Sequence, residues 1–222
     1  MLNSSANLVV KFWSVLLIFG CITDLVLLYL FGRQIPGYSQ ISGTISSLGE
    51  SASTVSGLVT IWSVILGVII IVFGFAFKMF FYASGKEVWK ASLLIIIYGF
   101  GENVASGIFR ADHINGTLTT MAIIHNIFGG LGMIAAILLP LVMMKIFSRE
   151  MYPAFFRLSR IVFAAGLISI LLFSLRTLYL QGSFLSTYKG LWQRIFLIDY
   201  YIYFITIAFM IIKNNNENST TN

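Results

Sequence analysis

The chain contains 222 residues, of which 58% are hydrophobic and only 10% are charged. A soluble globular domain carries about 25% charged residues, so the composition excludes a water-soluble domain and predicts a protein embedded in lipid. The net charge of +6 does not indicate a nucleic-acid-binding protein, because the basic residues lie at the ends of apolar segments. The single cysteine excludes an internal disulfide.

Six segments of the chain are long and apolar enough to cross a membrane, which takes about 20 residues of helix. They cover residues 9–31, 57–82, 89–109, 119–147, 156–180 and 191–212. We therefore predict an all-α fold, a polytopic membrane helical bundle with six transmembrane helices. Residues 1–213 are expected to form one domain, and the polar residues 214–222 a disordered cytoplasmic tail.

The basic residues near the ends of these segments predict the orientation of the bundle. Positive residues are more frequent on the cytoplasmic side of a membrane. Nine lie on the side of the two termini, which we therefore place in the cytoplasm: Lys11, Lys78, Lys86, Lys90, Lys145, Arg149, Arg157, Arg160 and Lys213. Five lie on the opposite side: Arg33, Arg110, Arg176, Lys189 and Arg194.

The first outer loop, residues 36–56, is rich in serine and has no long apolar run. Ile41, Ile45 and Leu48 recur at helical spacing, which predicts a short amphipathic helix at the interface, or a lid over the mouth of the bundle. Ser47 and Glu50 lie one helical turn apart and are expected to share a face of this helix. The alternative is a polar lid without chemistry.

Apart from basic residues near the cytoplasmic ends, the ionisable residues inside the predicted spans lie in the outer half of the membrane. Such residues cost roughly 2.5–3.5 kcal/mol each to insert, so they point to function. A channel or transporter for a polar solute needs polar partners along its whole path. The one-sided distribution therefore favours a pocket that opens to the outer leaflet. The residues are Asp24, Glu102, His125, Arg176, Arg194 and Asp199.

The charged residues of this outer half predict a ligand-binding site. Arginine side chains suit phosphate or carboxylate groups, so we expect an anionic head group on an apolar tail. The alternative is a set of structural ion pairs that hold the helices together. The predicted ligand-binding residues are Asp24, Glu50, Glu102, Arg110, Arg176, Arg194 and Asp199.

A serine hydrolase site is also compatible with these residues. Either Ser46 or Ser47 is a candidate nucleophile, His125 the base, and Asp112 or Asp24 the group that orients the base. We select Ser47, Asp112 and His125 as the candidate catalytic residues, although the chain has no GxSxG motif. We expect no metal and no cofactor, because two histidines cannot supply the three nitrogen or sulfur ligands of an intramembrane zinc hydrolase.

Four short motifs resemble those of a bacterial family of six-span membrane proteins, catalogued as domain of unknown function 998. They are TISSLGE at residues 44–50, IFRADH at 108–113, HNIFGG at 125–130 and GLWQR at 190–194. The resemblance covers nearly the whole chain, with departures from the family pattern at Arg110 and Gln193. It implies a six-span bundle in the bacterial inner membrane, and no established activity.

Our leading hypothesis is an outer-leaflet pocket that binds, and as a further step hydrolyses, a lipid or small amphiphile. Membrane lipids are its expected partners, and nucleic acid is not. A second hypothesis is an accessory subunit, bound to a partner protein or to a second copy, whose polar cluster is structural. A third is a proton-coupled transporter that uses Asp24, Glu102 and Asp199 as proton carriers. The sequence leaves open whether any reaction is catalysed.

Overall fold

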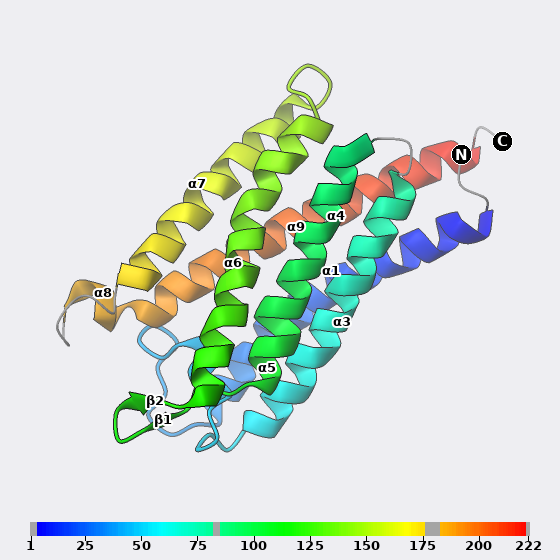
Figure 1. Cartoon of the computed structure of the whole chain (residues 1–222). Helices are drawn as coiled ribbons and strands as arrows, with labels where there is room; N and C mark the ends of the chain where they lie inside the picture. Colours follow the sequence, from blue (N-terminus) through cyan, green and yellow to red (C-terminus); the bar gives the residue numbers. More distant parts are fainter. Residues whose placement is uncertain (1–3, 82–84, 176–182, 221–222) are drawn as a thin grey trace.

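Helices dominate the computed structural model, which describes residues 4–81, 85–175 and 183–220. Six spans within these residues are long and apolar enough to cross a membrane. They are α1 (Ser4–Arg33), α3 (Ser56–Phe80), the continuous segment Gly85–Ile108, α6 (Thr120–Ile146), α7 (Pro153–Leu175) and α9 (Lys189–Thr220). The long helices pack side by side as one bundle (Figure 1). The predicted all-α bundle with six transmembrane helices is confirmed.

The third span changes its helical geometry part of the way along. It consists of α4 (Gly85–Tyr98), the π-helix η1 (Gly99–Ala105) and α5 (Ser106–Ile108). A Cβ atom added at Gly132 of α6 would lie 2.6 Å from the backbone nitrogen of Glu102 in η1. The two backbones therefore approach closely, as small residues allow in membranes. π-Helical turns are rare and occur frequently at functional sites.

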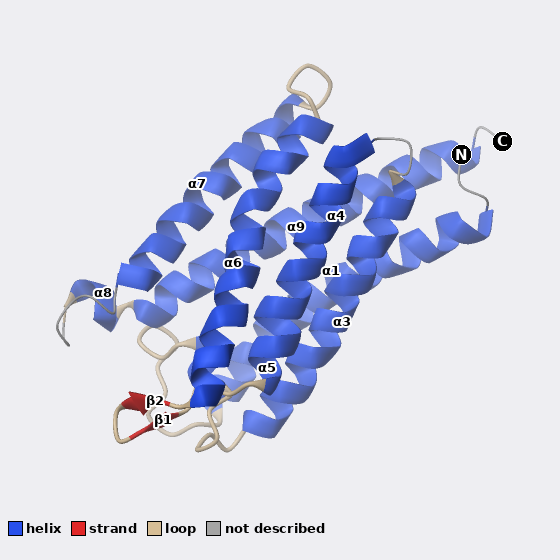
Figure 2. Cartoon of the chain, in the orientation of Figure 1, coloured by secondary structure: helices blue, strands red, loops and turns tan. Residues whose placement is uncertain are grey.

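The short elements gather at one end of the bundle, which we call the loop end (Figure 2). There lie the helical turn α2 (Ile45–Leu48), α8 (Phe184–Thr187) and the hairpin of β1 (His113–Ile114) and β2 (Thr117–Leu118). The hairpin turn uses Asn115 and Gly116 at positive φ, as a two-residue hairpin loop requires. Within the first loop α2 is one turn long, and its role as an amphipathic lid stays a prediction.

The first residues of α1 and the last residues of α9 lie together at the end opposite the loop end (Figure 1). This arrangement follows from an even number of spans. Which of the two ends faces the cytoplasm still rests on the count of basic residues. Helix α9 continues to Thr220, so the helical assignment extends into the segment that we expected to be a tail. The division at residue 213 stays a prediction.

Asp24 joins three helices in the centre of the bundle. Its side chain is only 6% exposed. One carboxylate oxygen accepts a hydrogen bond from Trp62 Nε1 of α3 at 2.7 Å, and the other accepts one from the Tyr201 hydroxyl of α9 at 2.7 Å. Both oxygens of Asp24 therefore have protein partners, which identifies it as a structural link between α1, α3 and α9.

Replacing Asp24 with alanine should destabilise the bundle by about 2–4 kcal/mol, because two buried donors would lose a charged acceptor. Thermal unfolding of the purified protein in detergent measures the loss. Ser14→Ala in the same helix is the matched control, since the Ser14 hydroxyl only donates to the Val10 carbonyl of its own helix. Equal losses in the two variants would show that Asp24 has no special role in linking the helices.

Candidate functional site

A cavity of about 610 Å³ opens at the loop end between the first loop, η1, α6, α7 and α9. One part of its wall is polar and the other is apolar. The polar part comprises Thr44, Ser46, Glu50, His113, His125 and Asn126. The apolar part comprises Met133, Ile134, Ile137, Ile170, Leu171 and Phe173, from α6 and α7. The cavity thus has the polarity of an amphiphile.

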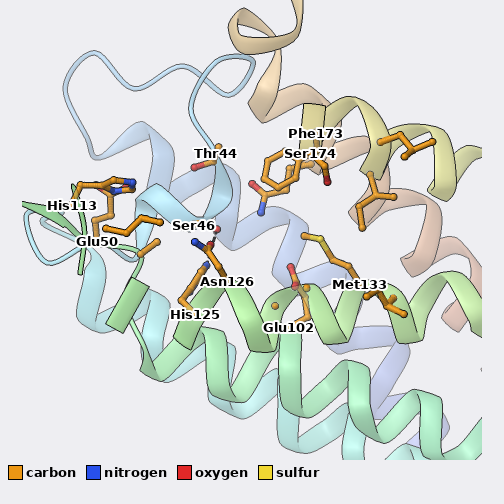
Figure 3. A pocket seen from close by; sticks show the side chains of 18 of the residues that line it. Thr44, Ser46, Glu50, Glu102, His113, His125, Asn126, Met133, Phe173 and Ser174 are labelled. Atoms are coloured by element: carbon orange, nitrogen blue, oxygen red, sulfur yellow. Dashed lines mark hydrogen bonds between the residues drawn. The ribbon is translucent and has the colours of Figure 1, made fainter. Parts of the chain in front are cut away.

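Ser46 and His125 meet at the polar end of this cavity, as Figure 3 shows. Nε2 of His125 lies 3.2 Å from the Ser46 hydroxyl oxygen. Nδ1 of His125 lies 2.9 Å from both the Ser106 and the Phe109 carbonyl oxygens. Carbonyls only accept hydrogen bonds, so Nδ1 carries the proton in neutral His125 and Nε2 offers its lone pair to the serine hydroxyl. This is the arrangement of a general base beside a nucleophile.

The two carbonyls that hold His125 belong to the last turn of the third span. The last carbonyls of a helix lack partners within the helix and carry its negative partial charge. They therefore hold the ring in one tautomer and one orientation. In a serine–histidine–aspartate triad a carboxylate has both of these functions. Here backbone groups perform them.

The first loop is attached to α9 by the motif GLWQR at residues 190–194. The Ile45 amide donates to Gln193 Oε1 at 2.7 Å, and the Leu191 amide donates to the Ile41 carbonyl at 2.9 Å. A side chain at Gly190 would collide with the Gly43 carbonyl, so only glycine permits this approach. These contacts fix α2 against α9 and position Ser46 one residue after the anchored Ile45.

Arg194 holds the same loop from the next position of α9. Its guanidinium donates to the Gly43 carbonyl at 2.8 Å, the Gly190 carbonyl at 3.0 Å and the Tyr38 hydroxyl at 2.7 Å. Burial raises the pKa of Tyr38, so its hydroxyl remains protonated and donates onward to the Thr44 carbonyl at 2.8 Å. The predicted ligand-binding role of Arg194 does not agree with this geometry, because its donors are directed at the loop.

Asp112 and Arg110 hold the other side of the first loop. The Ser51 amide and hydroxyl donate to the two oxygens of Asp112 at 2.7 and 2.6 Å, and Arg110 Nη1 donates to the Ser51 hydroxyl at 3.2 Å. The hydrogen bonds from Ser51 lower the pKa of Asp112, which keeps it ionised. Asp112 therefore orients Ser51 and not His125. Arg110 lines a small adjoining cavity of about 60 Å³.

Ser47 is directed away from His125. Its hydroxyl donates to the Thr44 carbonyl at 2.7 Å, and its amide is capped by the Thr44 hydroxyl. Of the two serines considered as nucleophile, the structure brings Ser46 to the histidine. The candidate catalytic set of Ser47, Asp112 and His125 stays a prediction. The hydrogen bonds of the Ser47 and Asp112 side chains go to other groups than the His125 ring, which Ser46 contacts.

Two predicted ligand-binding acids, Glu50 and Glu102, do line the cavity. Burial raises the pKa of Glu50, an effect that the nearby His113 partly offsets. The Glu102 carboxylate projects from η1 and has no hydrogen-bond or ion-pair partner within the described part of the chain. In Figure 3, Glu50 lies beside His113, and Glu102 lies beyond His125 in the direction of Met133.

Asp24 and Asp199 lie elsewhere in the described part of the chain. Asp24 is in the packed centre of the bundle. Asp199 does not line the cavity, and its buried Oδ2 has no partner among the residues described. Arg176 lies outside the described residues. The described lining of the main cavity contains no lysine or arginine, and Arg110 lines only the adjoining cavity.

Sequence reasoning missed Gln193 and the apolar wall between α6 and α7. Gln193 is 5% exposed and lines the cavity, but the sequence showed it only as a departure from a family pattern. Its position between Gly190 and Arg194 is the sequence feature that could have indicated a role at the site. No sequence feature could have indicated the apolar wall, because a cavity wall and a packed core contain the same kinds of side chain.

Comparison with known proteins identifies one family. The family described as "Protein of unknown function (DUF998)" matches residues 18–210, which extend from the first span into the last. No curated protein and no solved structure matches the chain. The matched range contains all four motifs that meet at the loop end.

Replacing Arg194 with alanine should loosen the first loop, because two charge-assisted hydrogen bonds to Gly43 and Tyr38 are lost and each contributes about 1.5–3 kcal/mol. We expect the amides of Ile45 and Ser47 to exchange hydrogen at least about tenfold faster, as measured by mass spectrometry. Arg33→Ala is the control, since Arg33 is exposed at the same end of the bundle. Unchanged exchange in Arg194→Ala would refute the attachment of the loop to α9.

Proposed function

The chain belongs to the DUF998 family of proteins of unknown function, and we propose that it binds a membrane amphiphile in the loop-end cavity and hydrolyses an ester bond in it. The observation that carries this proposal is the contact of 3.2 Å between the Ser46 hydroxyl and His125 Nε2. It lies at the polar end of a cavity whose other end is apolar. We place the loop end outside the cell, at the outer leaflet of a bacterial inner membrane, from the count of basic residues.

The size and position of the cavity suit a lipid-like ligand. Its volume of about 610 Å³ falls in the range of small-molecule sites, roughly 300–1,000 Å³. Ile134 of α6 and Leu171 of α7 line it and are 53% and 50% exposed. The cavity therefore reaches the surface that faces lipid, so a chain can enter sideways between α6 and α7. The polar group would then lie at Ser46.

Hydrolysis would proceed by way of an acyl-enzyme. Ser46 Oγ attacks the ester carbonyl carbon while its proton passes to His125 Nε2. The bond from the carbonyl carbon to the alkoxy oxygen breaks, and the alcohol leaves with that proton. Water then attacks the acyl-Ser46 ester, again assisted by His125, and releases the acid. The carbonyls of Ser106 and Phe109 stabilise the positive ring that forms in each step.

The nucleophile is tested by covalent labelling. A fluorophosphonate probe should label the wild-type protein at Ser46, and Ser46→Ala should abolish the labelling. His125→Gln should slow it by roughly 10²–10⁴-fold, the usual contribution of a general base. Ser47→Ala is the matched control and should label normally, because its hydroxyl is directed at Thr44. Labelling that depends on Ser47, or no labelling of the folded wild-type protein, would rule out Ser46 as a nucleophile.

The apolar wall is tested by filling it. Ile137→Trp should reduce hydrolysis of 4-nitrophenyl dodecanoate at least about tenfold, because the larger ring occupies the space for the chain. Leu138→Trp is the control, since Leu138 follows it on α6, is 43% exposed and does not line the cavity. The reduction in the rate of hydrolysis should be smaller for 4-nitrophenyl acetate, which has no long chain. Equal effects of both tryptophans, or equal loss with both esters, would contradict chain binding in this space.

A further inference from the structure

Two polar groups of the cavity have no role in the reaction described above. The first is the carboxylate of Glu102. Its Oε2 lies 3.3 Å from the position that a Cβ atom at Gly129 would occupy, and no group within the described residues is hydrogen bonded or ion paired with it. A carboxylate at membrane depth costs several kcal/mol unless it is paired. Glu102 is therefore positioned to receive a partner from outside the protein.

The second group is the side-chain amide of Gln193. The side chain is 5% exposed, and its Oε1 already accepts from the Ile45 amide. Its Nε2 donor has no acceptor among the residues that the structure describes, and the residue lines the cavity. This donor is accessible from the cavity, since it is not among the fully buried unpaired atoms of the described residues. A ligand oxygen that enters the cavity would accept a hydrogen bond from it.

These two groups and the reacting pair surround one small space. Ser46, Glu102, His125 and Gln193 line the main cavity, and the same four residues line the adjoining cavity of about 60 Å³. That space is too small for a lipid chain but suits the short acyl part of an ester. Arg110 also lines it, with Nη1 hydrogen bonded to Ser51.

We propose that the substrate is an aminoacyl ester of a lipid alcohol, with a small amino acid as the acyl group. In such an ester the ammonium nitrogen is two bonds from the carbonyl carbon, so the three recognition points are close together. The ammonium binds the Glu102 carboxylate, the carbonyl oxygen accepts from Gln193 Nε2, and the carbonyl carbon faces Ser46 Oγ. The lipid alcohol occupies the apolar part of the main cavity. Hydrolysis releases the free amino acid and the lipid alcohol. This inference rests on the proposed ester hydrolysis.

The test compares dodecyl alaninate with dodecyl propionate, which has the same size without the amino group. We first take the ratio of kcat/KM for the alaninate to kcat/KM for the propionate, in wild-type protein and in Glu102→Gln. The wild-type ratio divided by the Glu102→Gln ratio is the quantity of interest, because this quotient cancels the intrinsic reactivity of each ester. We expect the quotient to exceed about tenfold, since a charge-assisted hydrogen bond is lost only with the alaninate. Asp199→Asn, a change outside the cavity lining, should leave the ratio at its wild-type value.

A binding measurement separates this inference from the proposed function. In Ser46→Ala protein, titration calorimetry should show tighter binding of dodecyl alaninate than of dodecyl propionate, and the preference should disappear when Glu102→Gln is added. If both esters are hydrolysed and Glu102→Gln leaves their ratio unchanged, the aminoacyl assignment is wrong and ester hydrolysis stands. If both esters are bound without hydrolysis and Glu102→Gln leaves their ratio unchanged, both are wrong. If neither ester is hydrolysed while the binding preference depends on Glu102, the ammonium site stands and the hydrolytic function is wrong. If neither is bound or hydrolysed, both are wrong.

Discussion

The arrangement at the loop end depends on the hydrogen bond between the Ile45 amide and the Gln193 side chain. The first loop has no long apolar run that would hold it in place, so polar contacts must do so. Gln193 is buried, and water competes weakly for a hydrogen bond in such surroundings. Arg194 secures the loop one residue further along α9 through the Gly43 carbonyl. Because both contacts lie next to α2, they determine where Ser46 is placed.

Two acidic residues of the bundle, Asp24 and Glu102, have different surroundings. Asp24 has a donor at each oxygen and links three helices. Glu102 has neither a donor nor a cation among the described residues, although it also lies within a membrane span. The π-helix η1 and the glycine contact at Gly132 hold the Glu102 backbone against α6. A satisfied acid stabilises the fold, whereas an unsatisfied acid that faces a cavity is suited to binding.

Residue patterns in the sequence indicated where the candidate site lies, but not which residue has which role in it. The four motifs that suggested the family are brought together at the loop end, as their outer position had indicated. The spacing of Ser46 and Ser47 alone does not show which one faces His125, because successive helical residues point about 100° apart. Asp112 was expected to orient His125, and Arg194 was expected to bind a ligand. They act instead on Ser51 and Gly43, which lie far from them in the sequence.

The sequence by itself determined the class of the protein, the six spans and the end of the bundle where polar residues gather. It does so because lipid solvates each segment separately, so twenty apolar residues specify a span whatever their neighbours are. Only the tertiary structure decided which polar groups meet. Ser46 and His125 are 79 residues apart, and Ile45 and Gln193 are 148 apart. Such contacts arise from the packing of the loop against α6 and α9, which depends on all of these elements at once.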